Sequence, residues 1–207
     1  MLKILGRTSS LNVRKVLWTC DELGLAYERE DWGTGFASTK SPEFLALNPN
    51  ALVPVLIDEQ GPLYESNTIC RYLAARYGHG HLLPVEPRPR AGVEQWMDWQ
   101  ATTLNPTWGY AFLALGRPTP GHDDAGKIAA SVEAWNKAMA ILDQRLEETG
   151  AHAAGHDFTL ADVVLGVSVH RWMRTPMDRA TLPSVEAYYA RLKARPAFGP
   201  WALDEVP

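Results

Sequence analysis

The stretch that decides the fold reads "VPVLIDEQGPLYESNTICRYLAARYG", residues 53–78. Two short apolar runs, VPVLID and LYE, are separated by the turn residues EQGP, and this pattern is typical of a β-hairpin. In the segment that follows, Ile69, Leu73 and Tyr77 share one helical face, and Gly78 ends the pattern. The stretch therefore predicts two antiparallel strands followed by an amphipathic helix.

The residues before this unit predict a first α/β unit. Residues 2–5 form a short apolar run, and residues 13–23 carry apolar side chains at the i, i+3, i+4, i+7 spacing of a helix. Residues 26–31 are a weakly patterned strand, and residues 41–49 begin with a serine and a proline, as a short helix often does. The predicted order over residues 1–80 is βαβ followed by αββα.

The rest of the chain has a different character. Residues 81–90, "HLLPVEPRPR", are rich in proline and have no periodicity, so we expect a linker there. Every convincing segment of residues 91–207 has helical spacing, and "TLADVVLGVSVHRWMR" is apolar enough to be a central buried helix. The sequence thus predicts an α/β domain over residues 1–80 and an all-helical domain over residues 91–207.

Bulk composition limits the function. The 207 residues are 46% hydrophobic and carry a net charge of -4, which argues against nucleic acid or an anionic membrane as the main partner. The two cysteines lack metal-site spacing and fit a reducing compartment. No apolar run approaches the ~18 residues of a membrane span. We therefore expect a soluble, cytoplasmic protein without a metal.

Four stretches, "SSLNVRKV", "NPNALVPVL", "YESNTICRYL" and "FTLADV", occur in an order and at separations that carry a family resemblance. Together they resemble the cytosolic glutathione transferases, and the resemblance covers essentially the whole chain. It implies a thioredoxin-like domain that binds glutathione as co-substrate, and a helical domain that contributes the site for a small hydrophobic electrophile. It also implies a homodimer and no metal.

The resemblance assigns glutathione contacts to two of these stretches. It implies a cis bond between Val53 and Pro54 and a Val53 backbone that pairs with the cysteine of glutathione. Glu65 would accept from the γ-glutamyl ammonium, and Ser66 with the following helix N-terminus would hold the carboxylate. A plain N-cap with a nearby acid would explain the same two residues. Lys40 is a further candidate, for the glycine carboxylate.

The first stretch is the candidate for thiol chemistry. A free thiol has a pKa of about 8.5, so a hydroxyl and a helix N-terminus aimed at the sulfur would favour the thiolate. Aligned from Arg14, Ser10 falls where serine-type transferases carry the catalytic serine, and Asn12 where some bacterial relatives carry a sulfur-facing asparagine. We expect Ser10 as main donor, Asn12 as co-donor and Ser9 as a nearby contact. One of these residues can instead simply cap the helix.

The electrophile site is expected on the first helix of the second domain. Thr103, Trp108 and Phe112 are at roughly helical spacing, and Pro106 is expected to interrupt that helix. An aromatic stripe is more often core than pocket. The interruption favours Trp108 or Tyr110 facing a cleft, and Thr103 and Trp108 are the candidates for electrophile contacts.

The "FTLAD" stretch has a structural explanation, and the reaction itself stays open. Thr159 and Asp162 have the spacing of a capping box, so we expect them to stabilise a helix start and to take no part in catalysis. The leading hypothesis is thiolate addition to an electrophile. The alternatives are a glutathione-dependent reductase, isomerase or dehalogenase, and a binding protein that retains the fold without turnover.

Overall fold

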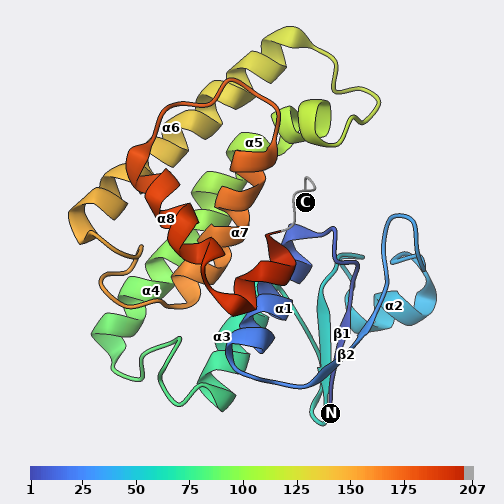
Figure 1. Cartoon of the computed structure of the whole chain (residues 1–207). Coiled ribbons are helices and arrows are strands. Elements are labelled where there is room, and N and C mark those ends of the chain that lie inside the picture. Colours follow the sequence, from blue (N-terminus) through green and yellow to red (C-terminus); the bar gives the residue numbers. More distant parts are fainter. Residues whose placement is uncertain (203–207) are drawn as a thin grey trace. The chain divides into compact units, whose positions relative to one another are not determined.

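The structure is a computed structural model that describes residues 1–202. The chain forms two compact units that divide between Val85 and Glu86, inside the stretch expected as a linker (Figure 1). Helix α4 begins at Pro87, so the last four residues of that stretch belong to its first turn. No helix within residues 1–202 combines the length and the apolar character needed to cross a membrane.

The first unit is a four-stranded sheet with helices, in the predicted βαβ–αββα order. Its elements are β1 (Leu2–Leu5), α1 (Leu11–Glu22), β2 (Tyr27–Glu30), α2 (Pro42–Leu47), β3 (Val55–Asp58), β4 (Gly61–Tyr64) and α3 (Ser66–Tyr77). The strands lie in the order β2-β1-β3-β4, with β1 and β2 parallel and the other pairs antiparallel. This is a thioredoxin-like arrangement, and the expected fold is confirmed.

The helices of this unit follow from their apolar spacing. The predicted face of α1 is fully buried at Val13, Val16, Leu17 and Cys20, and α1 packs along α3. A smaller cluster of Leu5, Phe44 and Val55 anchors α2 against the sheet. Ser41 caps α2 by accepting from the backbone N–H of Phe44 at 3.4 Å, as its serine-proline start predicts.

The second unit is all-helical, as expected. It comprises α4 (Pro87–Trp99), η1 (Gln100–Leu104), α5 (Asn105–Ala111), η2 (Phe112–Gly116), α6 (Ala125–Thr149), α7 (Leu160–Arg174), α8 (Pro183–Lys193) and the 3₁₀ turn η3 (Pro196–Trp201). Every residue from Leu160 to Trp172 is buried, so α7 is the central helix that its apolar sequence predicts.

The prediction that Pro106 interrupts the first helix of this unit is wrong. The chain runs helically from Pro87 to Gly116, and two of its segments, η1 and η2, are π-helical. The N–H of Asn105 bonds to the carbonyl of Gln100, five residues earlier. A proline removes one helical donor, and here the wider π turn directly before Pro106 lets the helix continue.

Candidate functional site

The strand register brings the candidate glutathione contacts to one edge of the sheet. Leu5, the last residue of β1, pairs with Glu30, the last residue of β2. Leu5 also pairs with Val55 at the start of β3, and Val55 pairs with Tyr64 at the end of β4. The segments that carry Ser9 and Ser10, Lys40, Val53 and Pro54, and Glu65 and Ser66 therefore all leave the sheet at this edge, although they are far apart in sequence.

Gly6 allows two of these segments to approach closely. It has a φ of +149°, and a Cβ built there would lie 2.5 Å from Cγ2 of Val13 and 3.1 Å from Cβ of Val53. A side chain at this position would therefore clash with α1 and with the segment before β3. The glycine places Val53 directly beside the turn that leads into α1.

Ser10 is the N-cap residue of α1, but its hydroxyl makes no capping hydrogen bond. The backbone alone starts the helix: the carbonyl of Ser10 accepts from the N–H of Arg14 at 3.0 Å, and its N–H donates to the carbonyl of Arg7 at 3.1 Å. Ser9 is half-buried beside it, and Asn12 is exposed in the first turn. The three thiol-site candidates thus surround one helix N-terminus, and the Ser10 hydroxyl is not occupied as a cap.

The Val53–Pro54 peptide bond is cis, as the resemblance implied. Pro54 is buried and Val53 half-buried, immediately before β3 begins. Within residues 1–202, no hydrogen bond is found for the N–H or the carbonyl of Val53. Both groups are therefore available to an extended peptide ligand.

The start of α3 has the features of a site for a zwitterion. Glu65 is exposed and has a φ of 70°, a conformation that non-glycine residues rarely adopt. Its carboxylate has no hydrogen-bond or ion-pair partner in the described part of the chain. Ser66, the first residue of α3, is only 7% exposed. A carboxylate acceptor thus lies next to the N-terminus of a twelve-residue helix.

Lys40 lies on the exposed loop between β2 and α2. Its backbone N–H donates to Oγ of Ser38 at 3.2 Å, and its side chain has no partner within the described residues. The loop leaves the sheet at the same edge as the segments that carry Ser10, Val53 and Glu65.

Two basic residues of α1 support the site and were not assigned a role from the sequence. The guanidinium of Arg14 is nearly buried, and its Nε donates to the carbonyl of Thr8 at 2.7 Å, which ties the turn before α1 to the helix. Lys15 is 1% exposed, and its Nζ donates to Oδ1 of Asn67 in the first turn of α3 at 3.1 Å. The signal that could have identified Arg14 and Lys15 from the sequence was a pair of adjacent charged residues within an otherwise apolar stretch of helix.

Both cysteines lie outside this chemistry. Cys20 and Cys70 are buried on α1 and α3. Burial raises the pKa of the Cys20 thiol far above its usual range, and it raises the pKa of the Cys70 thiol to about 11. Thiols in such surroundings are inert, so the sulfur chemistry of the site depends on a ligand thiol.

The electrophile candidates lie in the helical unit. Thr103 is exposed on the π-helical segment η1. Trp108, on α5, is half-buried: its indole packs edge-on against Phe112 with centroids 5.7 Å apart, and the guanidinium of Arg171 lies 4.5 Å from its ring centroid. Its Nε1 donates to Oδ1 of Asn105 at 3.2 Å. Trp108 is therefore held in a fixed orientation with part of its surface exposed.

Within residues 1–202, no group of three or more histidine, cysteine, aspartate or glutamate side chains has the arrangement of a metal site. The groups found in this region of the first unit are hydroxyl groups, backbone N–H groups at helix starts and the carboxylate of Glu65.

Comparisons with known proteins agree with this geometry. A family model for the glutathione S-transferase N-terminal domain matches residues 5–87. The chain is 36% identical over 199 residues to glutathione S-transferase GstB of Escherichia coli, covering 95% of each sequence. It is 29% identical over 199 residues to the disulfide-bond oxidoreductase YfcG of the same organism, covering 91% of this chain and 88% of YfcG.

A similar solved structure is the theta class glutathione S-transferase from Xanthomonas axonopodis pv. citri with glutathione bound. It has a TM-score of 0.93 and 36% sequence identity, and the match covers 100% of this chain and 99% of that one.

Proposed function

The chain belongs to the glutathione S-transferase family, and we propose that it adds the thiolate of glutathione to a small hydrophobic electrophile. The observation that carries this proposal is the open N-terminus of α1, where the Ser10 hydroxyl makes no capping bond. It lies at the sheet edge where the unpaired Val53 backbone and the Glu65 carboxylate also lie. Glutathione is a peptide thiol with a zwitterionic end, and these groups match its parts.

In this proposal, glutathione binds as a short extended strand. Val53 donates its N–H to, and accepts with its carbonyl from, the cysteine residue of glutathione. Glu65 accepts from the γ-glutamyl ammonium, while Ser66 and the backbone N–H groups of α3 hold the neighbouring carboxylate. Lys40 provides the positive charge for the glycine carboxylate.

Ser10 then stabilises the thiolate, with Asn12 as second donor and Ser9 as a neighbouring contact. At a pKa of about 8.5, few thiols are ionised at neutral pH. Lowering that value by about two units requires about 2.7 kcal/mol of preferential stabilisation of the thiolate. A hydrogen bond to a charged group contributes about 1.5–3 kcal/mol, and the N-terminus of α1 adds a further favourable field. The two effects together are large enough.

The thiolate forms a carbon–sulfur bond with the electrophile, and a leaving group such as halide departs with the electron pair. Thr103 and Trp108 are the proposed contacts for the apolar part of that substrate, which places the electrophile site on the helical domain of residues 91–207. We further propose a homodimer that works in the cytoplasm, where its two cysteines stay reduced.

Conjugation of glutathione to an aryl halide tests the proposal with wild type, Ser10→Ala and the matched control Ser184→Ala, on α8 of the helical unit. We expect Ser10→Ala to lower kcat/KM by about tenfold to a hundredfold, the effect of losing one bond to a charged group. The thiol pKa of bound glutathione, read from thiolate absorbance against pH, should rise in Ser10→Ala alone. Unchanged turnover in Ser10→Ala would transfer the donor role to Asn12 or Ser9. Glutathione binding without turnover in wild type would contradict the enzymatic proposal.

A second candidate reaction is favoured by the similarity to YfcG, whose name describes a disulfide-bond oxidoreductase. Here the bound thiolate attacks one sulfur of a disulfide, which forms a mixed disulfide and releases a thiolate. A second glutathione then reduces the mixed disulfide and leaves as oxidised glutathione. Turnover of a small disulfide in the absence of aryl halide conjugation would favour this reaction.

A further inference from the structure

Helix α5 carries Trp108, the proposed contact for the electrophile, and a side chain of a neighbouring helix bonds to its backbone. Helices α5 and α6 pack along one another within the helical unit (Figure 1). Ser131, in the second turn of α6, is half-buried. Its hydroxyl donates to the carbonyl of Thr107 at 2.6 Å and accepts from the N–H of Ala111 at 3.1 Å. One hydroxyl of α6 thus holds two backbone groups of α5.

These two backbone groups are not an arbitrary pair. Thr107 and Ala111 are four residues apart, so their carbonyl and N–H are the groups that an α-helix joins directly to each other. A side chain that inserts into this hydrogen-bond ladder is a known cause of helix distortion. The π-helical segment η2 begins at Phe112, the residue after Ala111, and single π turns occur frequently at functional sites. The bridge by Ser131 therefore accounts for the position at which the helix departs from α geometry.

The bridged turn contains Trp108, and the rings around it are tightly packed. The ring of Trp108 lies 6.1 Å, centroid to centroid, from the ring of Trp135, one turn beyond Ser131 on α6. Phe112, whose ring packs edge-on against Trp108, comes directly after the bridged turn. Trp135 is fully buried and Phe112 nearly so. Because closely packed side chains transmit a shift of the backbone, the shape of this turn determines where the Trp108 ring lies.

We propose that Ser131 is a positioning residue for the electrophile site, an inference that rests on the proposed role of Trp108. Its hydroxyl fixes the turn of residues 107–111 and so sets the spacing between the rings of Trp108 and Phe112. Without the hydroxyl, the N–H of Ala111 has the carbonyl of Thr107 as its acceptor within the helix, since a buried donor left unsatisfied is costly. The turn then changes shape and the indole moves with it. Ser131 acts through the backbone of α5 and not by contact with the substrate.

Two ligands that differ by one ring test this proposal without depending on turnover. S-methylglutathione and S-benzylglutathione both fill the proposed glutathione site, so the ratio of their dissociation constants, measured by calorimetry, reports the contacts of the ring. Wild type should bind the benzyl compound more tightly. We expect Ser131→Ala to reduce that preference about threefold to tenfold, the range for the loss of a well-placed aromatic contact, with binding of the methyl compound unchanged. Trp108→Leu should reduce the preference in the same way.

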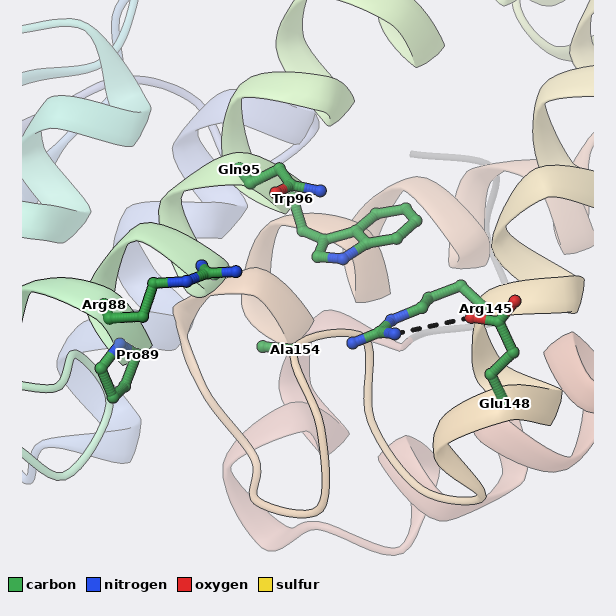
Figure 2. Close-up of a pocket in the computed structure, with 8 residues that line it drawn as sticks. Arg88, Pro89, Gln95, Trp96, Arg145, Glu148 and Ala154 are labelled. Carbon is green, nitrogen blue, oxygen red and sulfur yellow. Dashed lines mark ion pairs between the residues drawn. The ribbon is translucent and has the colours of Figure 1, made fainter.

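The conservative variant and a matched control separate positioning from general destabilisation. Ser131→Thr retains the hydroxyl and should bind both ligands as wild type does. Thr149→Ala removes a hydroxyl from the far end of α6, which within residues 1–202 bonds only to carbonyls of α6 itself. That end of α6 lines a separate pocket with α4, where Figure 2 shows Arg145 and Glu148 opposite Trp96. Thr149→Ala should therefore leave both dissociation constants unchanged.

Several results would overturn the proposal. These are an unchanged ratio in Ser131→Ala, an equal loss of affinity for both ligands in that variant, a reduced ratio in Ser131→Thr, or a wild type without preference for the benzyl compound. Ser131→Cys, which keeps the volume but has a weaker donor, decides the matter if Ser131→Ala does not fold. Failure of the proposed function looks different: the ratio would depend on Ser131 as described, yet wild type would conjugate no aryl halide.

Discussion

Replacing Asp162 by alanine should destabilise the helical unit far more than the loss of an ordinary helix cap. The carboxylate is fully buried at the start of α7. Its Oδ2 accepts from the N–H and the hydroxyl of Thr159 at 2.8 and 3.2 Å, in a capping box. Its Oδ1 accepts from the N–H of Ala153 at 3.0 Å and from the hydroxyl of Tyr188 at 2.9 Å. One side chain thus joins α7, the preceding loop and α8.

The magnitude follows from the donors that lose their acceptor. A simple cap contributes about 0.5–2 kcal/mol, which is what the sequence pattern alone predicts. Each buried donor left unsatisfied costs about 1–3 kcal/mol, and disruption of a buried charged network typically costs about 3–5 kcal/mol. We therefore expect Asp162→Ala to lower the free energy of unfolding by about 3–5 kcal/mol. For a chain of this size the melting temperature falls by roughly 6–20 °C.

Urea unfolding followed by circular dichroism, together with calorimetry, measures this loss. Asp157→Ala is the matched control, because Asp157 lies in the same loop but is exposed, and within residues 1–202 it pairs only with His156. It should unfold within about 0.5 kcal/mol of wild type. A loss below about 1 kcal/mol in Asp162→Ala would refute the argument that the four buried donors depend on this carboxylate.

Three further outcomes follow from the first unit. Glu65→Gly should raise stability by about 1 kcal/mol by relieving the positive φ, whereas Glu65→Ala should not, and calorimetry should show weaker glutathione binding in both. Burial raises the pKa of Cys70 from 9.0 to about 11. The contribution of the protonated thiol to the free energy of unfolding is therefore complete below pH 9 and is lost as the pH rises toward 11. Urea titrations across that window should show stability falling by about 1.4 kcal/mol per pH unit more steeply in wild type than in Cys70→Ala. Ellman's reagent should react with Cys20 and Cys70 only once denaturant unfolds the chain.

Local patterns predicted most of the fold because each element carries its own signal. The β-hairpin of residues 55–64 and the apolar face of α1 follow from spacing alone, and the buried length of α7 follows from its composition. The break at Pro106 was predicted wrongly because a proline in the sequence shows only that one backbone N–H donor is missing from the helix. Whether a wider turn accommodates that loss depends on the packing of the whole helix, which no local window contains.

The site was less predictable because it depends on register. Nothing local to residues 53–54 or 65–66 says that their segments leave the sheet at the same edge as the segment of Ser10. That edge is set by the pairing of Leu5 with Val55, and of Val55 with Tyr64. Lys15 was missed for a related reason. A lysine within an amphipathic helix is usually solvated, and only the packing of α1 on α3 places its ammonium next to Asn67.

Helix starts distinguish the site from the rest of the chain. Side chains cap α2, α6 and α7, through Ser41, Asp124 and the Asp162 carboxylate, and α4 and α8 begin with a proline, which removes one donor. Among helices that start from non-helical backbone within residues 1–202, α1 and α3 have neither a side-chain cap nor a proline in the first turn. An uncapped start costs roughly 0.5–2 kcal/mol, and the free N–H groups that remain bind anions. The two helices that begin at the proposed glutathione site are thus the two left open, one for the thiolate and one for the carboxylate.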